Sequence, residues 1–276
     1  LGFSSSPLAN IGSILNRGVE LAMNISAINT RNVRWDIRAG GNTLHNELTS
    51  LGTVLPFNIG GGRTLVGQQI GVMVSKRIES INTTTNVVTV SDTLAPMGNL
   101  FPTLEWNFTN TVTLFQNLRL NALLDSKRDF TIFNNTAFFR ETQLVRSNLR
   151  LDPTVLSATE RLRRYGNPTS GQPAFVTNKG NAATVNDVRD AFIEKGDFVR
   201  LREISATYTV PSSLAKRLGG VVDGASITFA MQNVKLWSDY SGPDPEVIAQ
   251  AGAFSREDFL TLPNARKSVL RFNFTF

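Results

Sequence analysis

The side chains that carry most enzyme chemistry are scarce in this sequence. Among 276 residues it has one histidine, His45, and no cysteine. The missing cysteines exclude disulfides, thiol catalysis and thiolate metal sites, and one histidine leaves little material for a zinc site or a catalytic triad. We therefore predict no metal, no cofactor and no enzymatic activity, and we expect His45 to be a solvated loop residue without a partner.

A first group of candidate residues consists of charged side chains that alternate with apolar neighbours along extended segments. The group contains Arg34, Asp36, Arg38, Arg119, Asp125 and Arg271. If these segments pair, the side chains share one face of a sheet. There they could line a substrate path, or form a cross-strand ladder of charges in which each pair contributes roughly a few tenths of a kcal/mol. The ladder is the favoured interpretation.

A second group of candidate residues lies in the stretch LWSDYSGPDPEV (236–247). It combines Trp237, Tyr240, Asp244 and Glu246. Aromatic rings beside carboxylates could contact a sugar or a cation. A turn shaped by proline and glycine, with the aromatic residues at a membrane interface, explains the same composition and is the favoured interpretation.

The composition favours a membrane barrel. Charged residues make up 18% of the chain and the formal net charge is +6. This charged fraction is below the roughly 25% usual for soluble domains, yet no run approaches the roughly 18 apolar residues of a spanning helix. Basic clusters such as Arg161, Arg163 and Arg164 are more typical of a solvated helix face than of a nucleic-acid site, so nucleic-acid binding is not expected.

Seven segments alternate between apolar and polar residues with a period of two, which predicts β-strands. They span 17–28, 33–43, 104–114, 118–127, 198–209, 224–236 and 267–276. In the last segment Phe272, Phe274 and Phe276 share one face, while Arg271 and Asn273 share the other. In a membrane barrel the phenylalanines would face lipid and the polar residues a wet interior.

The connections between these segments alternate in length. Short ones cover 29–32, 115–117 and 210–223, and long ones cover 44–103, 128–197 and 238–266. Transmembrane barrels have short periplasmic turns and long outer loops. The predicted fold class is therefore all-β: the C-terminal seven or so antiparallel strands of a large transmembrane β-barrel. Because seven strands leave an open edge, which lipid does not tolerate, we expect the chain to be a fragment of a longer one.

Some signals refine this pattern. In 198–209 the parity of the apolar face turns Arg200 and Arg202 outward, so both are expected at or above the outer membrane interface, where lipid-facing arginine costs only about 0–1 kcal/mol. Short helices are expected at 154–166, at 212–220 and, from a capping-box pattern, at 255–259.

Several motifs resemble the C-terminal part of SusC/RagA-type TonB-dependent outer-membrane transporters. Successive strands of that family are similar to ILNRGVELAMN (14–24), WDIRAGGNTLHNELTSLG (35–52) and FTNTVTLFQNLRLNALLD (108–125). The closest match is GDFVRLREISATYTVPSSLAKRLG (196–219), followed in family order by QNVKLW (232–237), SGPDPEV (241–247) and the terminal RFNFTF (271–276). The similarity covers most of the chain.

The resemblance implies a 22-stranded barrel with a plug that imports oligosaccharides or peptides across the outer membrane of a Gram-negative bacterium. The TonB complex would drive import, and a SusD-like lipoprotein would cover the outer loops. The signal peptide and the plug would lie upstream of this chain. The charged residues of the first group would then contact the plug, and Phe272, Phe274 and Phe276 would form the C-terminal outer-membrane signal.

Two other functions remain open. A membrane-barrel enzyme of the protease or phospholipase kind needs a His/Asp/Ser set at the barrel rim, which a single histidine without a paired acid does not provide. A soluble β-sandwich binding module would have to carry all of its long connections at one end, which is uncommon. Such a module should be soluble without detergent.

Overall fold

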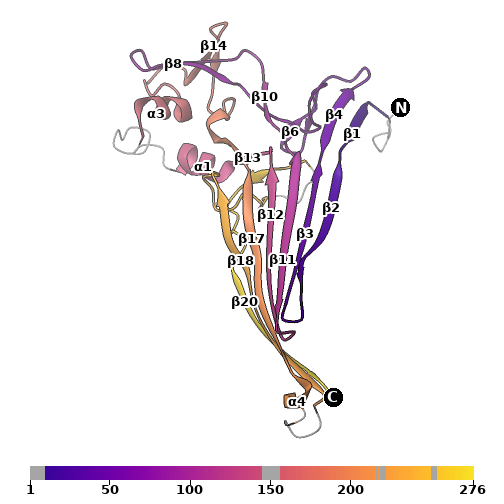
Figure 1. The fold of residues 1–276 in the computed structure, drawn as a ribbon. Coiled ribbons are helices and arrows are strands. Elements are labelled where there is room, and N and C mark those ends of the chain that lie inside the picture. Colours follow the sequence, from indigo (N-terminus) through magenta and orange to yellow (C-terminus); the bar gives the residue numbers. More distant parts are fainter. Residues whose placement is uncertain (1–9, 145–155, 216, 218–221, 250–253) are drawn as a thin grey trace, which may run out of the picture.

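An antiparallel sheet of seven strands is the main element of the computed structural model, which describes residues 10–144, 156–215, 217, 222–249 and 254–276. The strand order is β2-β3-β11-β12-β17-β18-β20, and Figure 1 shows these strands as a tall wall. The seven strands are β2 (Glu20–Asn29), β3 (Val33–Thr43), β11 (Leu104–Leu114), β12 (Leu118–Arg128), β17 (Phe198–Val210), β18 (Gly224–Ser238) and β20 (Lys267–Thr275). One of them falls in each segment that alternates in the sequence.

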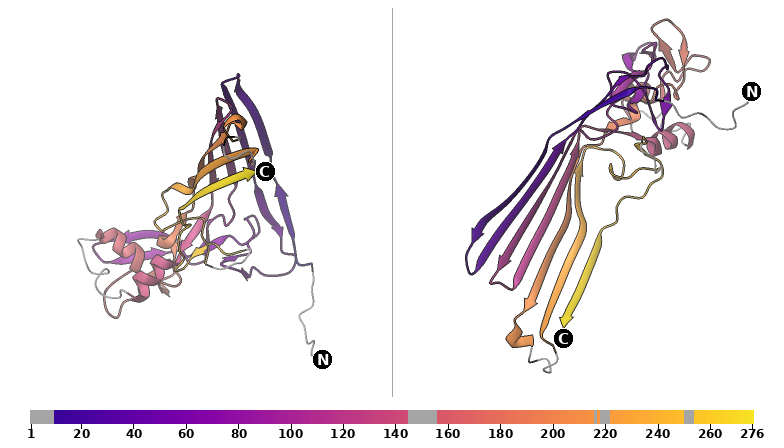
Figure 2. Two further views of the ribbon diagram at one scale, coloured as in Figure 1. Left: turned by 90° about the horizontal axis from the view of Figure 1, so that it is seen from below. Right: turned by 90° about the vertical axis from the view of Figure 1, so that its right-hand side faces the viewer.

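Short turns join the strands in pairs at one end of the wall. The turn between β11 and β12 is residues 115–117, and the one between β17 and β18 contains the short helix α4 (Ser212–Ala215). The C-terminus lies at this end, while the long connections gather at the opposite end (Figure 1). Figure 2 shows the sheet as open and curved, with β2 and β20 at its two edges.

The long connections fold into small sheets and short helices, and β1 extends the β2 edge beside them (Figure 1). Their strands, with β1, are β1 (Ser13–Arg17), β4 (His45–Ser50), β5 (Asn58–Ile59), β6 (Gly62–Arg63), β7 (Met73–Ser75), β8 (Ile78–Asn82), β9 (Val87–Val90), β10 (Ala95–Gly98), β13 (Thr131–Asn134), β14 (Phe175–Thr177), β15 (Ala182–Ala183), β16 (Ile193–Lys195) and β19 (Glu257–Asp258). Their helices are α1 (Asn135–Phe139), the π-helical turn η1 (Arg140–Leu144), α3 (Ala158–Tyr165) and the 3-10 turn η2 (Asp190–Phe192). The alternation pattern did not predict these small strands.

The hydrophobic core lies among the long connections and the strand ends beside them. Its three clusters of buried side chains include Leu100, Phe175 and Phe130, respectively. Large apolar side chains of the long strands are exposed instead, among them Leu120 of β12 and Phe229 of β18. The described helices include none that is long and apolar enough to cross a membrane. The wall therefore presents an apolar face that no described part of the chain covers.

A bulge near the end of β2 changes the alternation expected there. The register shifts between Ser26 and Ile28, so Ile28 pairs with Trp35 and Ala27 is the extra residue. An extra residue lets the strand twist and returns a large apolar side chain to the apolar face. The simple period of two had placed Ala27 on that face.

The expected helices have different outcomes. The helix at 154–166 is present as α3 within the described residues, and Ser157 caps it by accepting a hydrogen bond from the Glu160 backbone N–H at 3.2 Å. The helix at 212–220 is present as α4 over its first residues, and part of the remainder lies outside the described residues. The helix at 255–259 is wrong. There β19 pairs in parallel with β13, and strand pairing outweighs the local capping signal.

The prediction for His45 is wrong in part: the side chain is exposed, as expected, but the residue belongs to a strand and has a partner. His45 begins β4, which pairs with β1, and its Nε2 lies 3.2 Å from Glu47 Oε2. The partner is two residues away on the same strand, on the same side of the sheet. A spacing of two could have revealed it once this stretch was assigned to a strand.

Candidate functional site

One face of the wall carries rows of polar side chains that cross the strands. The register places Arg34 and Arg119 on either side of Thr113. The full row, in strand order, contains Asn29, Arg34, Thr113, Arg119, Thr207, Thr228 and Arg271. We call this side of the sheet the polar face, and it brings Arg34, Arg119 and Arg271 of the first candidate group into one row.

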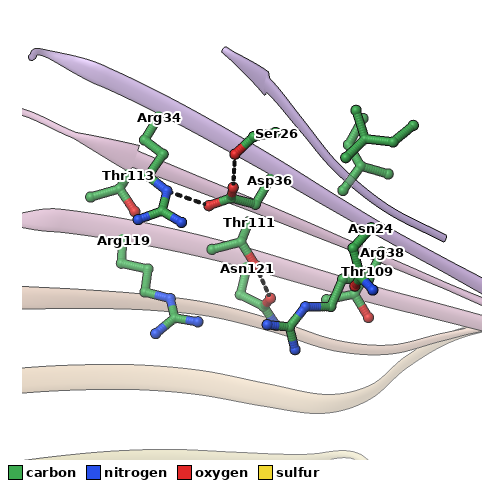
Figure 3. Close-up of a pocket in the computed structure, with 12 residues that line it drawn as sticks. Asn24, Ser26, Arg34, Asp36, Arg38, Thr109, Thr111, Thr113, Arg119 and Asn121 are labelled. Atoms are coloured by element: carbon green, nitrogen blue, oxygen red, sulfur yellow. Dashed lines mark hydrogen bonds and ion pairs between the residues drawn. The ribbon is translucent and has the colours of Figure 1, made fainter. Parts of the chain in front are cut away.

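The next row contains the carboxylate of Asp36. Ser26 donates a hydrogen bond from Oγ to Asp36 Oδ1 at 2.5 Å, and Arg34 Nε lies 2.8 Å from Asp36 Oδ2 (Figure 3). Thr111 donates from its hydroxyl to Asn121 Oδ1 at 3.0 Å in the same region. These side chains border a hollow of about 1010 Å³. Figure 3 shows that Arg38, on the same face, also projects into it.

The expected ladder of charges is incomplete. Arg34 and Asp36 form an ion pair, but both belong to β3, so the pair does not cross between strands. The side chains of Arg119 and Arg271 make no hydrogen bond or ion pair with any residue that the structure describes. The polar face therefore offers arginines with unused hydrogen-bond donors.

The opposite side of the wall, which we call the apolar face, carries the terminal phenylalanines. Phe272, Phe274 and Phe276 expose 55%, 55% and 79% of their surfaces, and Phe272 pairs across the strands with Ile227. Arg271 and Asn273 fall on the polar face, because alternate residues of a strand point to opposite sides. The predicted division of the last strand into two faces is present.

A second bulge overturns the expected outward position of Arg200 and Arg202. In the pairing of β12 with β17, the register shifts around Arg202, and Asp125 pairs with Arg200. The extra residue reverses the parity of the strand above it, so Arg200 joins Asp125 on the polar face. The outward orientation expected for the two arginines is therefore wrong, while their position at or above the outer membrane interface stays a prediction.

Both arginines instead bind carboxylates of the last long connection. Arg200 Nη2 lies 2.5 Å from Asp244 Oδ1, and the two side chains are 3% and 2% exposed. Arg202 reaches Asp125 with Nε and Nη2 at 2.7 and 2.8 Å, and it also donates from Nη1 to Glu246 at 2.7 Å. Two adjacent strands and a loop are joined by this group, which we call the junction cluster (Asp125, Arg200, Arg202, Asp244 and Glu246).

The loop end of the junction cluster is closed by Asn264. Its backbone N–H and its side-chain amide both lie 3.2 Å from Asp244 Oδ2. Asp244 also accepts a hydrogen bond from the Glu246 backbone N–H at 3.0 Å. Asp244 thus holds the start and the end of the last long connection together above β17.

Tyr240 and Trp237, which belong to the second candidate group, have separate environments. The Tyr240 hydroxyl is buried and donates to Asp258 Oδ2 at 2.9 Å. Burial raises the pKa of Tyr240, and the negative charge of Asp258 raises it further. Trp237 lies near the end of β18 and is 47% exposed. The four residues of the group therefore do not form one open site, and three of them hold the loop in place.

Sequence reasoning had missed Arg200 and Arg202 as partners of the second candidate group. Arg200 and Asp244 are 44 positions apart, and only the bulge turns the two side chains toward each other. A partial signal was available, since the carboxylates of Asp244 and Glu246 and the arginines Arg200 and Arg202 both stand two positions apart. No group of three or more potential metal ligands occurs among the residues with a described structure.

An antiparallel sheet with one apolar and one polar face, and with its long connections at one end, has the features expected of part of a transmembrane β-barrel. The sequence has relatives of this kind, although no protein-family model matches it. It is 23% identical to TonB-dependent receptor P26 of Formosa agariphila over 100% of this chain, and 23% identical to TonB-dependent receptor P3 of the same organism over 99%. The chain spans 30% of the length of each relative.

Solved structures share the fold. The chain superposes on the RagAB peptide transporter with a TM-score of 0.72 at 19% identity, covering 97% of this chain and 30% of the other. For the open-open state of the RagAB peptide importer the TM-score is 0.71 at 18% identity, covering 96% and 29%. The chain is therefore similar over nearly its whole length to part of two TonB-dependent receptors, and it shares its fold with part of the RagAB peptide transporter, in agreement with the resemblance that the motifs indicated.

Proposed function

We propose that this chain forms wall and outer loops of a TonB-dependent outer-membrane importer for peptides or oligosaccharides that works with a SusD-like lipoprotein. The exposed apolar face in the middle of the sheet carries this proposal. Leu120, Ile204 and Phe229 lie on the three inner strands β12, β17 and β18, and they expose 39%, 37% and 45% of their surfaces. Unpaired edges do not explain this exposure, because each of these strands has neighbours on both sides.

Lipid is the surrounding in which such a face is stable. Apolar surface left in water costs free energy, about 25 cal/mol for each Å², and a soluble sandwich would bury it against a second sheet. In the outer membrane the apolar face meets hydrocarbon and the polar face meets the water-filled interior. The short turns then lie at the periplasmic side, with Phe276 and Trp237 near the two interfaces where aromatic residues gather.

The outer loops are packed against one another and against the strand ends, and together they form a platform. Their three buried clusters and the junction cluster fix them to the strand ends. A SusD-like lipoprotein would rest on this platform, and the TonB complex would act through parts of the receptor outside this chain. The fold shared with the RagAB peptide transporter supports peptides ahead of oligosaccharides as the imported class.

This part of the receptor would act as a barrier between the lipid and the imported solute. The sheet keeps the lipid away from the imported solute, and its hydroxyl, amide and guanidinium groups keep the interior wet. The five inner strands of the sheet pair with a neighbour on both sides, as hydrocarbon requires, and the edge strands β2 and β20 would pair with further strands of the barrel. Energy for release and transport would come from TonB.

Fractionation of the native organism tests the proposal. Peptides of this chain should be found by mass spectrometry in the outer-membrane fraction, in a band whose mobility changes on boiling and whose size exceeds that of a 276-residue chain. Deleting the gene should abolish uptake of labelled peptides. Recovery from the soluble fraction, at the size of this chain alone, would refute the proposal.

A further inference from the structure

The half of the polar face nearest the short turns carries an excess of positive charge. Three successive rows of that face contain five cations and two carboxylates. They are Arg34, Arg38, Arg119, Lys267 and Arg271, with Asp36 and Glu203. In the junction cluster, near the other end of the wall, the arginines are paired with carboxylates. The excess of positive charge therefore lies in the half nearest the short turns.

Most of the positive charge in these rows is not neutralised by residues that the structure describes. Asp36 is bound by Arg34 at 2.8 Å. Arg119 and Arg271 have no hydrogen-bond or ion-pair partner in the part of the chain that the structure describes. Figure 3 shows the Arg119 side chain extended into the hollow beside Thr113 and Asn121. Free guanidinium groups and small hydroxyl and amide side chains together make a surface suited to binding anions.

The spacing of the arginine row suits a ligand with several charges. Neighbouring strands lie about 4.8 Å apart, so Arg34 and Arg119 are separated by roughly 10 Å and Arg119 and Arg271 by roughly 14 Å. An extended peptide places residues three or four apart at about the same distances. Guanidinium groups stay charged at all relevant pH values and bind carboxylates in a bidentate manner.

We propose that the row of Arg34, Arg119 and Arg271, beyond the plug contact that the resemblance implies, selects imported solutes that carry carboxylates, with acidic peptides as the substrate class. This inference rests on the proposed function and refines it. Charges in a wet interior are screened beyond about 8 Å. The row therefore acts on solutes that pass close to the wall. Each contact is weak enough to be released, which transport requires.

The test measures uptake by the intact receptor with its lipoprotein partner in cells. The probes are a fluorescent heptapeptide with three glutamates and its counterpart with three glutamines. Wild type should favour the acidic peptide severalfold, and Arg119→Gln and Arg271→Gln should each reduce that preference by about two- to fivefold. Arg119→Lys should retain part of it. Arg31→Gln, which removes the same charge from the turn between β2 and β3, should leave it unchanged.

Three other results of the uptake experiment would contradict this inference. If both peptides enter equally well in wild type, the row does not select solutes, although the importer function stands. If Arg119→Gln lowers the uptake of both peptides by the same factor, with normal receptor abundance, the row serves another part of the receptor and the inference is wrong. If neither peptide enters, the peptide-import proposal fails, and this inference fails with it.

Discussion

Arg202 Nε lies 2.7 Å from Asp125 Oδ1, although the two residues are 77 positions apart. The same guanidinium holds Glu246 of the last long connection. The bulge in β17 makes this contact possible. Arg202 is the extra residue of the bulge, so its side chain does not follow the regular alternation of faces and reaches Asp125. A single irregularity thus connects the polar face of the wall to the outer loop above it.

Replacing Arg202 with glutamine should loosen the last long connection. The change removes the cation that binds Asp125 and leaves Glu246 with only the longer contact to Arg200 at 3.6 Å. We expect a local loss of about 1–3 kcal/mol. Protease added to intact cells should cut residues 238–266 faster, while the boiled and unboiled bands stay normal. Arg31→Gln serves as the charge-matched control. Equal cleavage in both variants would show that the Arg202 contacts do not hold the loop.

Replacing Asp244 with asparagine should be more damaging. Arg200 is 3% exposed, and without Asp244 it keeps only the longer contact to Glu246 at 3.6 Å. A buried charge is then largely unpaired, at a cost of up to about 3–5 kcal/mol. The amount of assembled, heat-modifiable receptor should fall. Adding Arg200→Met to Asp244→Asn should restore part of it, because the unpaired charge is removed. If the double variant is no better than Asp244→Asn alone, the pair is not the reason for the loss.

Arginine at position 229 should impair assembly, whereas arginine at position 230 should be tolerated. Phe229 lies on the apolar face, where arginine costs about 2–4 kcal/mol near the middle of the membrane. Ala230 is its neighbour on the polar face and pairs with Ser205. The receptor in the outer-membrane fraction is quantified for both variants. Similar abundance would contradict the assignment of the two faces.

Docking of the loop around Tyr240 should weaken at high pH. The folded state holds the pKa of Tyr240 above its ordinary value, mainly through burial. Stability is therefore complete below the ordinary pKa of about 10 and declines as the pH rises above it. Proteolysis of the loop measured from pH 8 to pH 11 should accelerate in wild type. Tyr240→Phe should lose the hydrogen bond to Asp258 and show a flatter pH profile.

The faces of the wall could be predicted because their signal is local. Phe272, Phe274 and Phe276 alternate with polar residues, and the period of a strand fixes which side each one takes. The lengths of the connections then indicated which ends of the strands are joined closely. These features need no knowledge of distant contacts.

The junction cluster could not be predicted in the same way. Its contacts depend on the bulge at Arg202, and nothing in the alternation of 198–209 marks an extra residue there. The turn between β11 and β12 shows the same limit. Phe115 and Gln116 have φ angles of 50° and 65°, a conformation usually taken by asparagine and glycine in tight hairpins. Strand pairing on both sides imposes it here.

The environment of alternate residues in β18 tests the account most directly. The chain has no cysteine, so single cysteines can be placed in this segment at positions 226 to 231, in a receptor whose other cysteines are removed, and labelled with a fluorophore. In membranes containing brominated lipids, we predict quenching at positions 227, 229 and 231 and little quenching at positions 226, 228 and 230. Equal quenching at all six positions, or quenching only at the even ones, would contradict a wall with lipid on its apolar face.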